Sequence, residues 1–114
     1  MIIHLVLLQP KADLSAPDRD ALLDAVRHAI TTIPDIRRAH VGRRRIMGRP
    51  YDALVTRHFE YALVLEFNDE AALRRYLDHP AHEELGRRFY LSSDAALALD
   101  FEMVEAARVR DLIG

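Results

Sequence analysis

The segment His-Phe-Glu-Tyr-Ala-Leu-Val-Leu-Glu-Phe at residues 58–67 decides the fold. Apolar or aromatic side chains occupy every position on one of its faces: Phe59, Tyr61, Leu63, Leu65 and Phe67. Ala62 and Val64 make the centre of the opposite face apolar as well. A strand that is apolar on both faces usually lies in the middle of a sheet. Residues 2–8, Ile-Ile-His-Leu-Val-Leu-Leu, share this character, so the sequence predicts two central strands.

Between and after these two strands, the sequence predicts three helices and two further strands. Ser15 and Pro17 begin a helix whose apolar stripe ends before Pro34. Asp69 begins a second helix that reaches about Asp78. The pair His79-Pro80 then separates it from a third helix that runs to about Leu91. Residues 36–46 predict a charged edge strand, and residues 96–104 predict the last strand.

The predicted order is β-α-β-β-α-β, the split βαβ or ferredoxin-like arrangement of an α+β protein. Its usual strand order in a four-stranded antiparallel sheet, 4-1-3-2, places strands one and three in the centre. These are also the two strands predicted to be buried on both sides. We expect one domain over residues 1–104, followed by a C-terminal tail at residues 105–114.

Composition narrows the classes of function. The 114 residues include 16 Lys and Arg against 18 Asp and Glu, and this near-neutral balance argues against nucleic acid or a membrane as partner. The chain has no Cys, which excludes disulfides, Cys-ligated zinc, iron–sulfur clusters and a thiol nucleophile. The apolar residues 1–10 lack the features of a signal peptide and are too short for a membrane span, so we expect a cytoplasmic protein.

The second apolar face of the sheet needs a cover. Helices of a split βαβ fold lie on one face only, so a monomer would leave a large apolar patch in water. The simplest solution, and the one we expect, is a homodimer that stacks two sheets face to face as a dimeric α/β barrel. The alternative is that the tail or the loop at residues 47–57 folds over that face.

The segment from Tyr76 to His82 carries the most informative polar residues. In the helix after Pro80, His82 shares an apolar stripe with Leu85 and Phe89, and Tyr76 faces inward from the helix before it. An imidazole beside a phenol in an apolar pocket can act as a general base with a hydrogen-bonding partner. The alternative is an interior histidine that only satisfies its hydrogen bonds. His4 is the natural third member, although alternation alone leaves open which sheet face meets the helices.

A metal site is the weaker interpretation of the histidines. Pro80 separates His79 from His82, no carboxylate stands at a ligand spacing, and Cys is absent. We therefore expect neither a metal nor a cofactor.

The sequence resembles the stress-responsive A/B barrel (Dabb) family over about residues 2–104. The resemblance lies in the His-Pro-Ala-His run after a Tyr-bearing helix, and in the strands Ile-His-Leu-Val-Leu, Tyr-Ala-Leu-Val-Leu-Glu-Phe and Ala-Leu-Asp-Phe-Glu. It implies a dimeric ferredoxin-like barrel. The best-understood enzyme of the Dabb family is a plant polyketide cyclase that works without a cofactor. That enzyme's histidine base corresponds to His82, its tyrosine partner to Tyr76 and a further pocket histidine to His4.

Two pocket positions depart from the cyclase. Tyr61 stands where the cyclase has a third-strand histidine, and Val26 stands where it has an aromatic residue. We expect an apolar pocket in which His82 and Tyr76 act catalytically on a small carbonyl-bearing molecule. The other predicted pocket residues contact the ligand: His4, Tyr61, Leu63, Phe89 and His79. The competing hypothesis is a non-catalytic, stress-related dimeric protein in which these side chains only fill the core.

The basic stretch from Arg37 to Arg57 allows two interpretations. Its seven arginines can attract a carboxylate or phosphate at a pocket mouth. Alternatively, they keep an edge strand soluble or pair across a dimer, which is the interpretation we favour.

Overall fold

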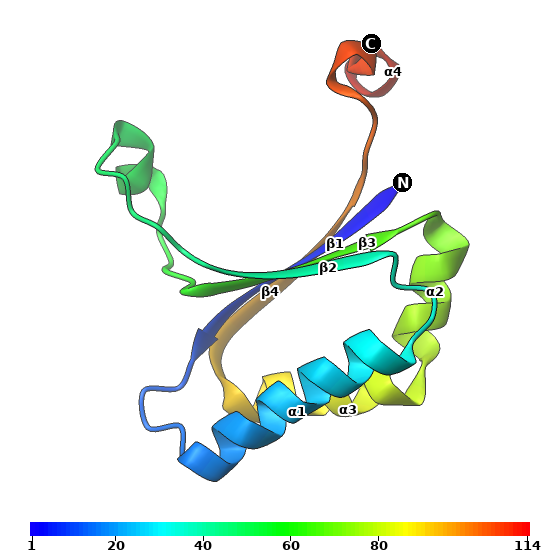
Figure 1. Ribbon diagram of the computed structural model, residues 1–114. Helices are drawn as coiled ribbons and strands as arrows, with labels where there is room; N and C mark the ends of the chain where they lie inside the picture. Colours follow the sequence, from blue (N-terminus) through cyan, green and yellow to red (C-terminus); the bar gives the residue numbers. More distant parts are fainter.

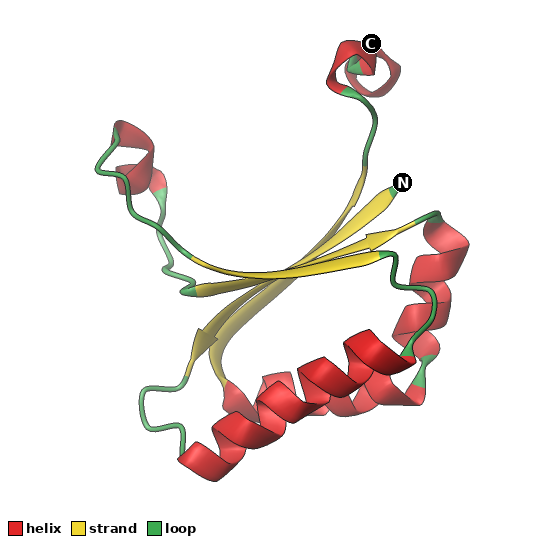
Figure 2. Cartoon of the chain, in the orientation of Figure 1, coloured by secondary structure: helices red, strands yellow, loops and turns green.

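In the computed structural model, which describes residues 1–114, four strands form one antiparallel sheet with three helices on one face (Figure 1). The strand order is β2-β3-β1-β4, so the first and third strands are central, as predicted. The strands are β1 (Ile2–Pro10), β2 (Arg38–Arg43), β3 (Tyr61–Phe67) and β4 (Ser93–Glu102). The helices on this face are α1 (Ala16–Thr32), α2 (Glu70–Asp78) and α3 (Pro80–Ser92), and Figure 2 shows all three on the same side. A fourth, short helix, α4 (Arg110–Ile113), lies near the C-terminus, away from this layer (Figure 1). None of the helices combines the length and apolar character needed to cross a membrane.

Side-chain caps fix where the helices begin. The Ser15 hydroxyl accepts a hydrogen bond from the Asp18 amide at 3.2 Å, and the Asp69 carboxylate accepts one from the Ala72 amide at 2.8 Å. Such a cap typically contributes about 1 kcal/mol. His79 ends α2 and also caps α3, because its Nδ1 accepts from the Ala81 amide at 3.0 Å. The chain therefore changes direction within one residue, between Tyr76 on α2 and the first turn of α3.

Strand pairing decides which side chains face the helices. His4 lies opposite Leu65 on β3 and opposite Asp100 on β4. Because Leu65 is buried in the core, the face that carries His4, Val6 and Leu63 is the face that meets the helices. The largest buried side chains of that core include Tyr76, Phe67 and Leu65.

All four strands have different ends from those predicted, and β1 extends to Pro10 rather than ending at Leu8. Strand β2 covers only Arg38–Arg43 of the predicted 36–46, and β3 begins at Tyr61 rather than at residue 58. Arg43 and Tyr61 form the last pair of these two strands, and beyond them the chain leaves the sheet. Strand β4 covers Ser93–Glu102 rather than 96–104, because it pairs with β1 along its whole length, from Ile2 to Pro10.

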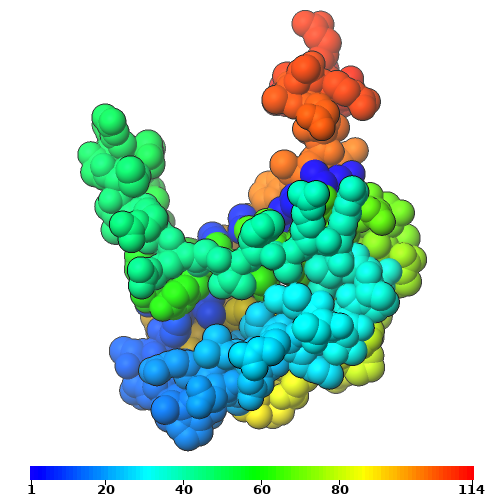
Figure 3. Space-filling model, in the orientation of Figure 1, coloured from blue at the N-terminus to red at the C-terminus, as the bar shows by residue number.

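The sheet face opposite the helices is open. Its apolar residues on β1 and β4 lie side by side, and Leu97, Leu99 and Phe101 remain 42%, 41% and 44% exposed. Two segments, which we call the arms, rise beside this face: residues 44–57 and residues 103–114 (Figure 1). Figure 3 shows that the arms stand at opposite ends of the sheet and leave the space between them empty. Neither the tail nor the 47–57 loop therefore covers the face within one chain.

Candidate functional site

Tyr76 stands at the centre of a three-residue cluster beneath the sheet. Its ring centroid lies 5.7 Å from that of His4 on β1 and 4.7 Å from that of His82 on α3, both in edge-on geometry. Tyr76 is 1% exposed and His4 5%, whereas His82 is half-buried. The structure thus brings together the three residues that the sequence analysis singled out. It also shows that the face of β1 carrying His4 meets the helices.

Burial controls the protonation of the pair Tyr76 and His82. Burial raises the pKa of the Tyr76 hydroxyl to about 12, so the phenol keeps its proton at neutral pH. Burial lowers the pKa of His82, and the electrostatic effect of the nearby His4 lowers it further. A backbone hydrogen bond at Leu77 acts in the opposite direction. His82 therefore favours the neutral form, which is the form that accepts a proton.

Asp100 is a member of the cluster that the sequence analysis missed. Its Oδ1 lies 2.5 Å from Nδ1 of His4, which it faces across the β1–β4 pairing. The carboxylate of Asp100 accepts a hydrogen bond from the Nδ1–H of His4, and in the neutral imidazole this leaves Nε2 as the acceptor. The signal was a carboxylate among the apolar residues 95–101 of the last strand, and identifying its partner required the register of β1 against β4.

An apolar cleft of about 350 Å³ lies beside the cluster, between α1, α3 and the sheet. Three of the predicted ligand-contacting residues line it: Tyr61, Leu63 and Phe89. His4, Tyr76 and His82 are not among its lining residues. Val6 lines the cleft and is the next residue after His4 on the same face of β1, so the cleft ends one residue step from the cluster.

The other predicted residues have structural partners. His79 caps α3 with its ring nitrogen, as described above. No group of three or more His, Cys, Asp or Glu side chains is arranged to hold a metal ion. Three arginines of the basic stretch pair with carboxylates of the same chain: Arg37 with Glu66 at 3.7 Å, Arg44 with Asp52 at 4.0 Å and Arg57 with Asp94 at 2.6 Å.

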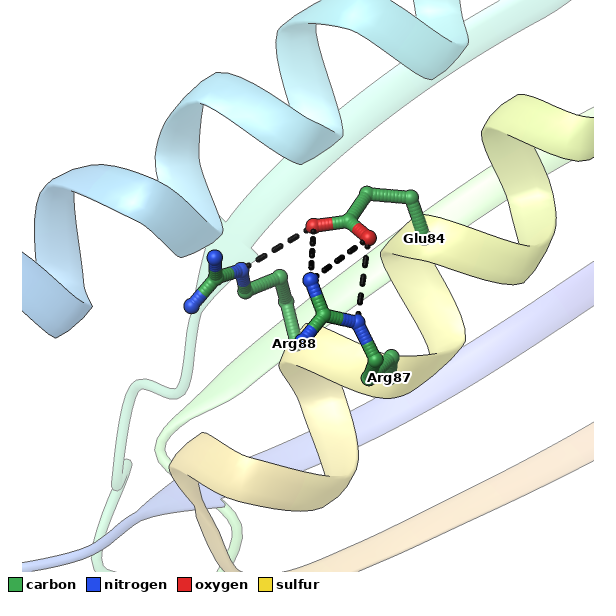
Figure 4. Close-up of polar contacts among 3 residues, drawn as sticks. All are labelled: Glu84, Arg87 and Arg88. Carbon is green, nitrogen blue, oxygen red and sulfur yellow. Dashed lines mark hydrogen bonds and ion pairs between the residues drawn. The ribbon is translucent and has the colours of Figure 1, made fainter.

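A separate group of charges lies on the surface of α3. Figure 4 shows that Glu84 receives hydrogen bonds from both Arg87 and Arg88. Hydrogen bonding by Arg87, reinforced by Arg88, holds the pKa of Glu84 below its usual value. These are pairs three and four residues apart on one helix, and they support the helix rather than a ligand site.

Comparison with known proteins identifies the family and the fold. A family model, the stress responsive A/B barrel domain, matches residues 2–103. A comparison with curated protein sequences finds no match. Three solved structures resemble the chain over most of its length. The first, a protein from Arabidopsis thaliana, has a TM-score of 0.74 and 20% identity, covering 93% of this chain and 98% of that one. The second, the hydroxynitrile lyase from Passiflora edulis, has a TM-score of 0.74 and 17% identity, covering 92% and 94%.

The third is a dimeric ferredoxin-like protein of unknown function from Thermobifida fusca, with a TM-score of 0.67 and 20% identity, covering 90% of each chain. These structures share the ferredoxin-like fold with this chain, and the family model covers nearly all of it. The chain therefore belongs to the stress-responsive A/B barrel domain family.

Proposed function

We propose that the protein carries out acid–base chemistry on a small carbonyl-bearing molecule without a cofactor, with His82 as the base and Tyr76 as the hydrogen-bond donor. The observation that carries this proposal is the contact between the buried phenol of Tyr76 and the half-buried imidazole of His82, 4.7 Å apart between ring centroids. Burial favours opposite roles for the two groups, since it keeps the phenol protonated and the imidazole neutral.

The chemistry follows from these two protonation states. A neutral His82 accepts a proton from a carbon next to a carbonyl group, and negative charge then develops on the carbonyl oxygen. The hydroxyl of Tyr76 donates a hydrogen bond to that oxygen and stabilises the charge. His4, held by Asp100, orients the ligand from the sheet. The apolar cleft lined by Leu63 and Phe89 takes the body of the molecule.

The class of reaction is that of a lyase or cyclase. A hydroxynitrile lyase shares this fold, which supports a lyase-type reaction by analogy. Removal of a substrate proton by a general base is the step that lyase and cyclase reactions of this kind can share.

The test is deuterium exchange into a ketone, followed by NMR. In deuterated buffer, a working base removes a proton from the methyl group of acetophenone and returns a deuteron. We expect the protein to accelerate this exchange and His82→Ala to abolish the acceleration. Tyr76→Phe should slow it by about 10²-fold, since one oxyanion donor is lost. His28→Ala is the matched control, because His28 is an exposed histidine on α1. Equal exchange in the wild type and in His82→Ala would remove His82 from the role of base.

The protein also forms a homodimer in this proposal, with the open sheet faces of two copies packed together. Two observations support it: the exposed apolar residues on that face, and the dimeric description of a structure with the same fold. The measurement is the molar mass by light scattering. A stable monomer at micromolar concentration would contradict the dimer. A dimer that accelerates no exchange would favour the alternative, a non-catalytic structural protein.

A further inference from the structure

The apolar cleft has one charged lining residue, Arg19 on α1. Ten of its twelve lining residues are hydrophobic, and they come from α1, α3 and three strands. Leu22, Leu23 and Val26 line the cleft from α1, at positions three, four and seven after Arg19. This spacing puts Arg19 on the same helix face as the apolar residues, one turn before them. A single cation therefore stands at the N-terminal end of an apolar stripe.

Arg19 has no carboxylate partner in the protein. Other arginines of the chain pair with nearby acids, among them Arg27 with Asp24 on the same helix. No ion pair involves Arg19, and its side chain is exposed. An unpaired guanidinium at the edge of an apolar cleft is complementary to a molecule with an apolar body and an anionic end.

We propose that the cleft binds an amphipathic carboxylate, whose anionic end pairs with Arg19 and whose apolar body lies along the cleft toward Val6 and Leu63. This inference rests on the proposed function and names its substrate class. From Arg19 to Val26 the helix rises about 10 Å, at 1.5 Å per residue, which sets the length of the apolar body. The far end of such a molecule points toward the His4 side of the cleft, since Val6 is the next residue after His4 on that face.

Arg43 is the competing cation. Tyr61 and Ala62 line the cleft and also line a neighbouring groove that contains Arg43, Arg44 and Arg57. Arg44 and Arg57 are paired with Asp52 and Asp94, but Arg43 makes no ion pair. Arg43 does not line the cleft, so the inference assigns the carboxylate to Arg19 and predicts no contribution from Arg43.

The experiment compares octanoate with octanamide, two molecules of the same chain length that differ in charge. Isothermal titration gives the Kd of each probe for the wild type and for Arg19→Gln, Arg43→Gln and Arg27→Gln. We expect Arg19→Gln to raise the Kd of octanoate about three- to tenfold, which is the range for an ion pair at the edge of an apolar site. The Kd of octanamide should not change in any variant. Salt should weaken octanoate binding to the wild type more than binding to Arg19→Gln.

The outcomes separate this inference from the proposed function. If octanamide binds but Arg19→Gln leaves the Kd of octanoate unchanged, the inference fails and the cleft remains a ligand site. If Arg43→Gln or Arg27→Gln weakens octanoate binding as much as Arg19→Gln does, the assignment to Arg19 also fails. If neither probe binds the wild type, the cleft is not a ligand site, and this part of the proposed function fails with the inference.

Discussion

Replacing Leu99 with glutamate tests the role of the open sheet face. Leu99 lies opposite Leu5 on β1, and Leu5 lies opposite Val64 on β3, so the three side chains form a row across the centre of that face. Leu99 is 41% exposed in the single chain. A substitution there places a charge in the middle of the proposed dimer contact without disturbing the core beneath the helices.

The magnitude follows from the exposed fraction. Full burial of a leucine side chain contributes about 1.5–3 kcal/mol, so covering the remaining two-fifths contributes about 0.6–1.2 kcal/mol. A twofold interface contains Leu99 twice, which makes about 1.2–2.4 kcal/mol for the dimer. Loss of this contribution alone raises the dissociation constant roughly 7- to 50-fold, at about 1.4 kcal/mol per factor of ten. Two buried carboxylates raise it further, because each must leave water without a partner.

The assay is sedimentation equilibrium over a range of concentrations, with circular dichroism as a check that Leu99→Glu still folds. Tyr90→Glu is the matched control, since Tyr90 is 82% exposed and lies on α3, on the opposite side of the sheet. We expect Leu99→Glu to shift the protein toward monomer and Tyr90→Glu to leave the dissociation constant unchanged. An unchanged dissociation constant for a folded Leu99→Glu protein would refute the packing of these faces.

Three further predictions concern the site and the helices. The pKa of His82 is lower in the folded protein than in the unfolded chain, so the unfolded state binds the proton more readily; stability is therefore lost as pH falls below about 6.5. Urea unfolding at pH 5 to 8 should show a smaller loss in His82→Gln, and an identical slope in both proteins would speak against the buried imidazole. Asp100→Asn removes the charged partner of His4 and should slow ketone exchange about tenfold with the fold intact; full activity in this variant would exclude a positioning role for Asp100. Ser15→Ala removes the cap of α1 and should lower the free energy of unfolding by about 1 kcal/mol in denaturant titration, whereas an unchanged midpoint would mean that water satisfies the Asp18 amide equally well.

The fold could be predicted from the sequence because its signals are local. The two segments that are apolar on both faces predicted the central strands β1 and β3. Ser15, Asp69 and Pro80 indicated where the helices begin. The ends of β2, β3 and β4 could not be predicted, because they depend on where the neighbouring strand stops. Residues 43, 44 and 45 are all arginines, so residue type cannot distinguish them, yet only Arg43 lies in β2.

The candidate site was predictable only in part. The contact of Tyr76 with His82 agrees with the inward positions expected on α2 and α3. The contact of Tyr76 with His4 could not be predicted from alternation, which left open the face of β1 that meets the helices. The partnership of His4 with Asp100 depends on a register that joins residues 96 positions apart. The cleft lined by Leu63 and Phe89 does not reach His4, Tyr76 or His82. The extent of a cleft depends on how side chains fill the space between helices and sheet, which the order of residues in the sequence does not reveal.

Strand β1 shows how this fold restricts amino-acid substitutions. None of its residues from Ile2 to Pro10 is exposed in the structure. Even-numbered positions such as His4 and Val6 face the cluster and the cleft, whereas odd-numbered positions such as Leu5 face the open side. In most antiparallel sheets with one solvent-exposed face, every second side chain points to solvent and can be exchanged for other polar residues. In this strand a substitution always reaches either the ligand-facing layer or the layer available to a second copy, so a saturation-mutagenesis scan should find no tolerant alternate positions between Ile2 and Leu8.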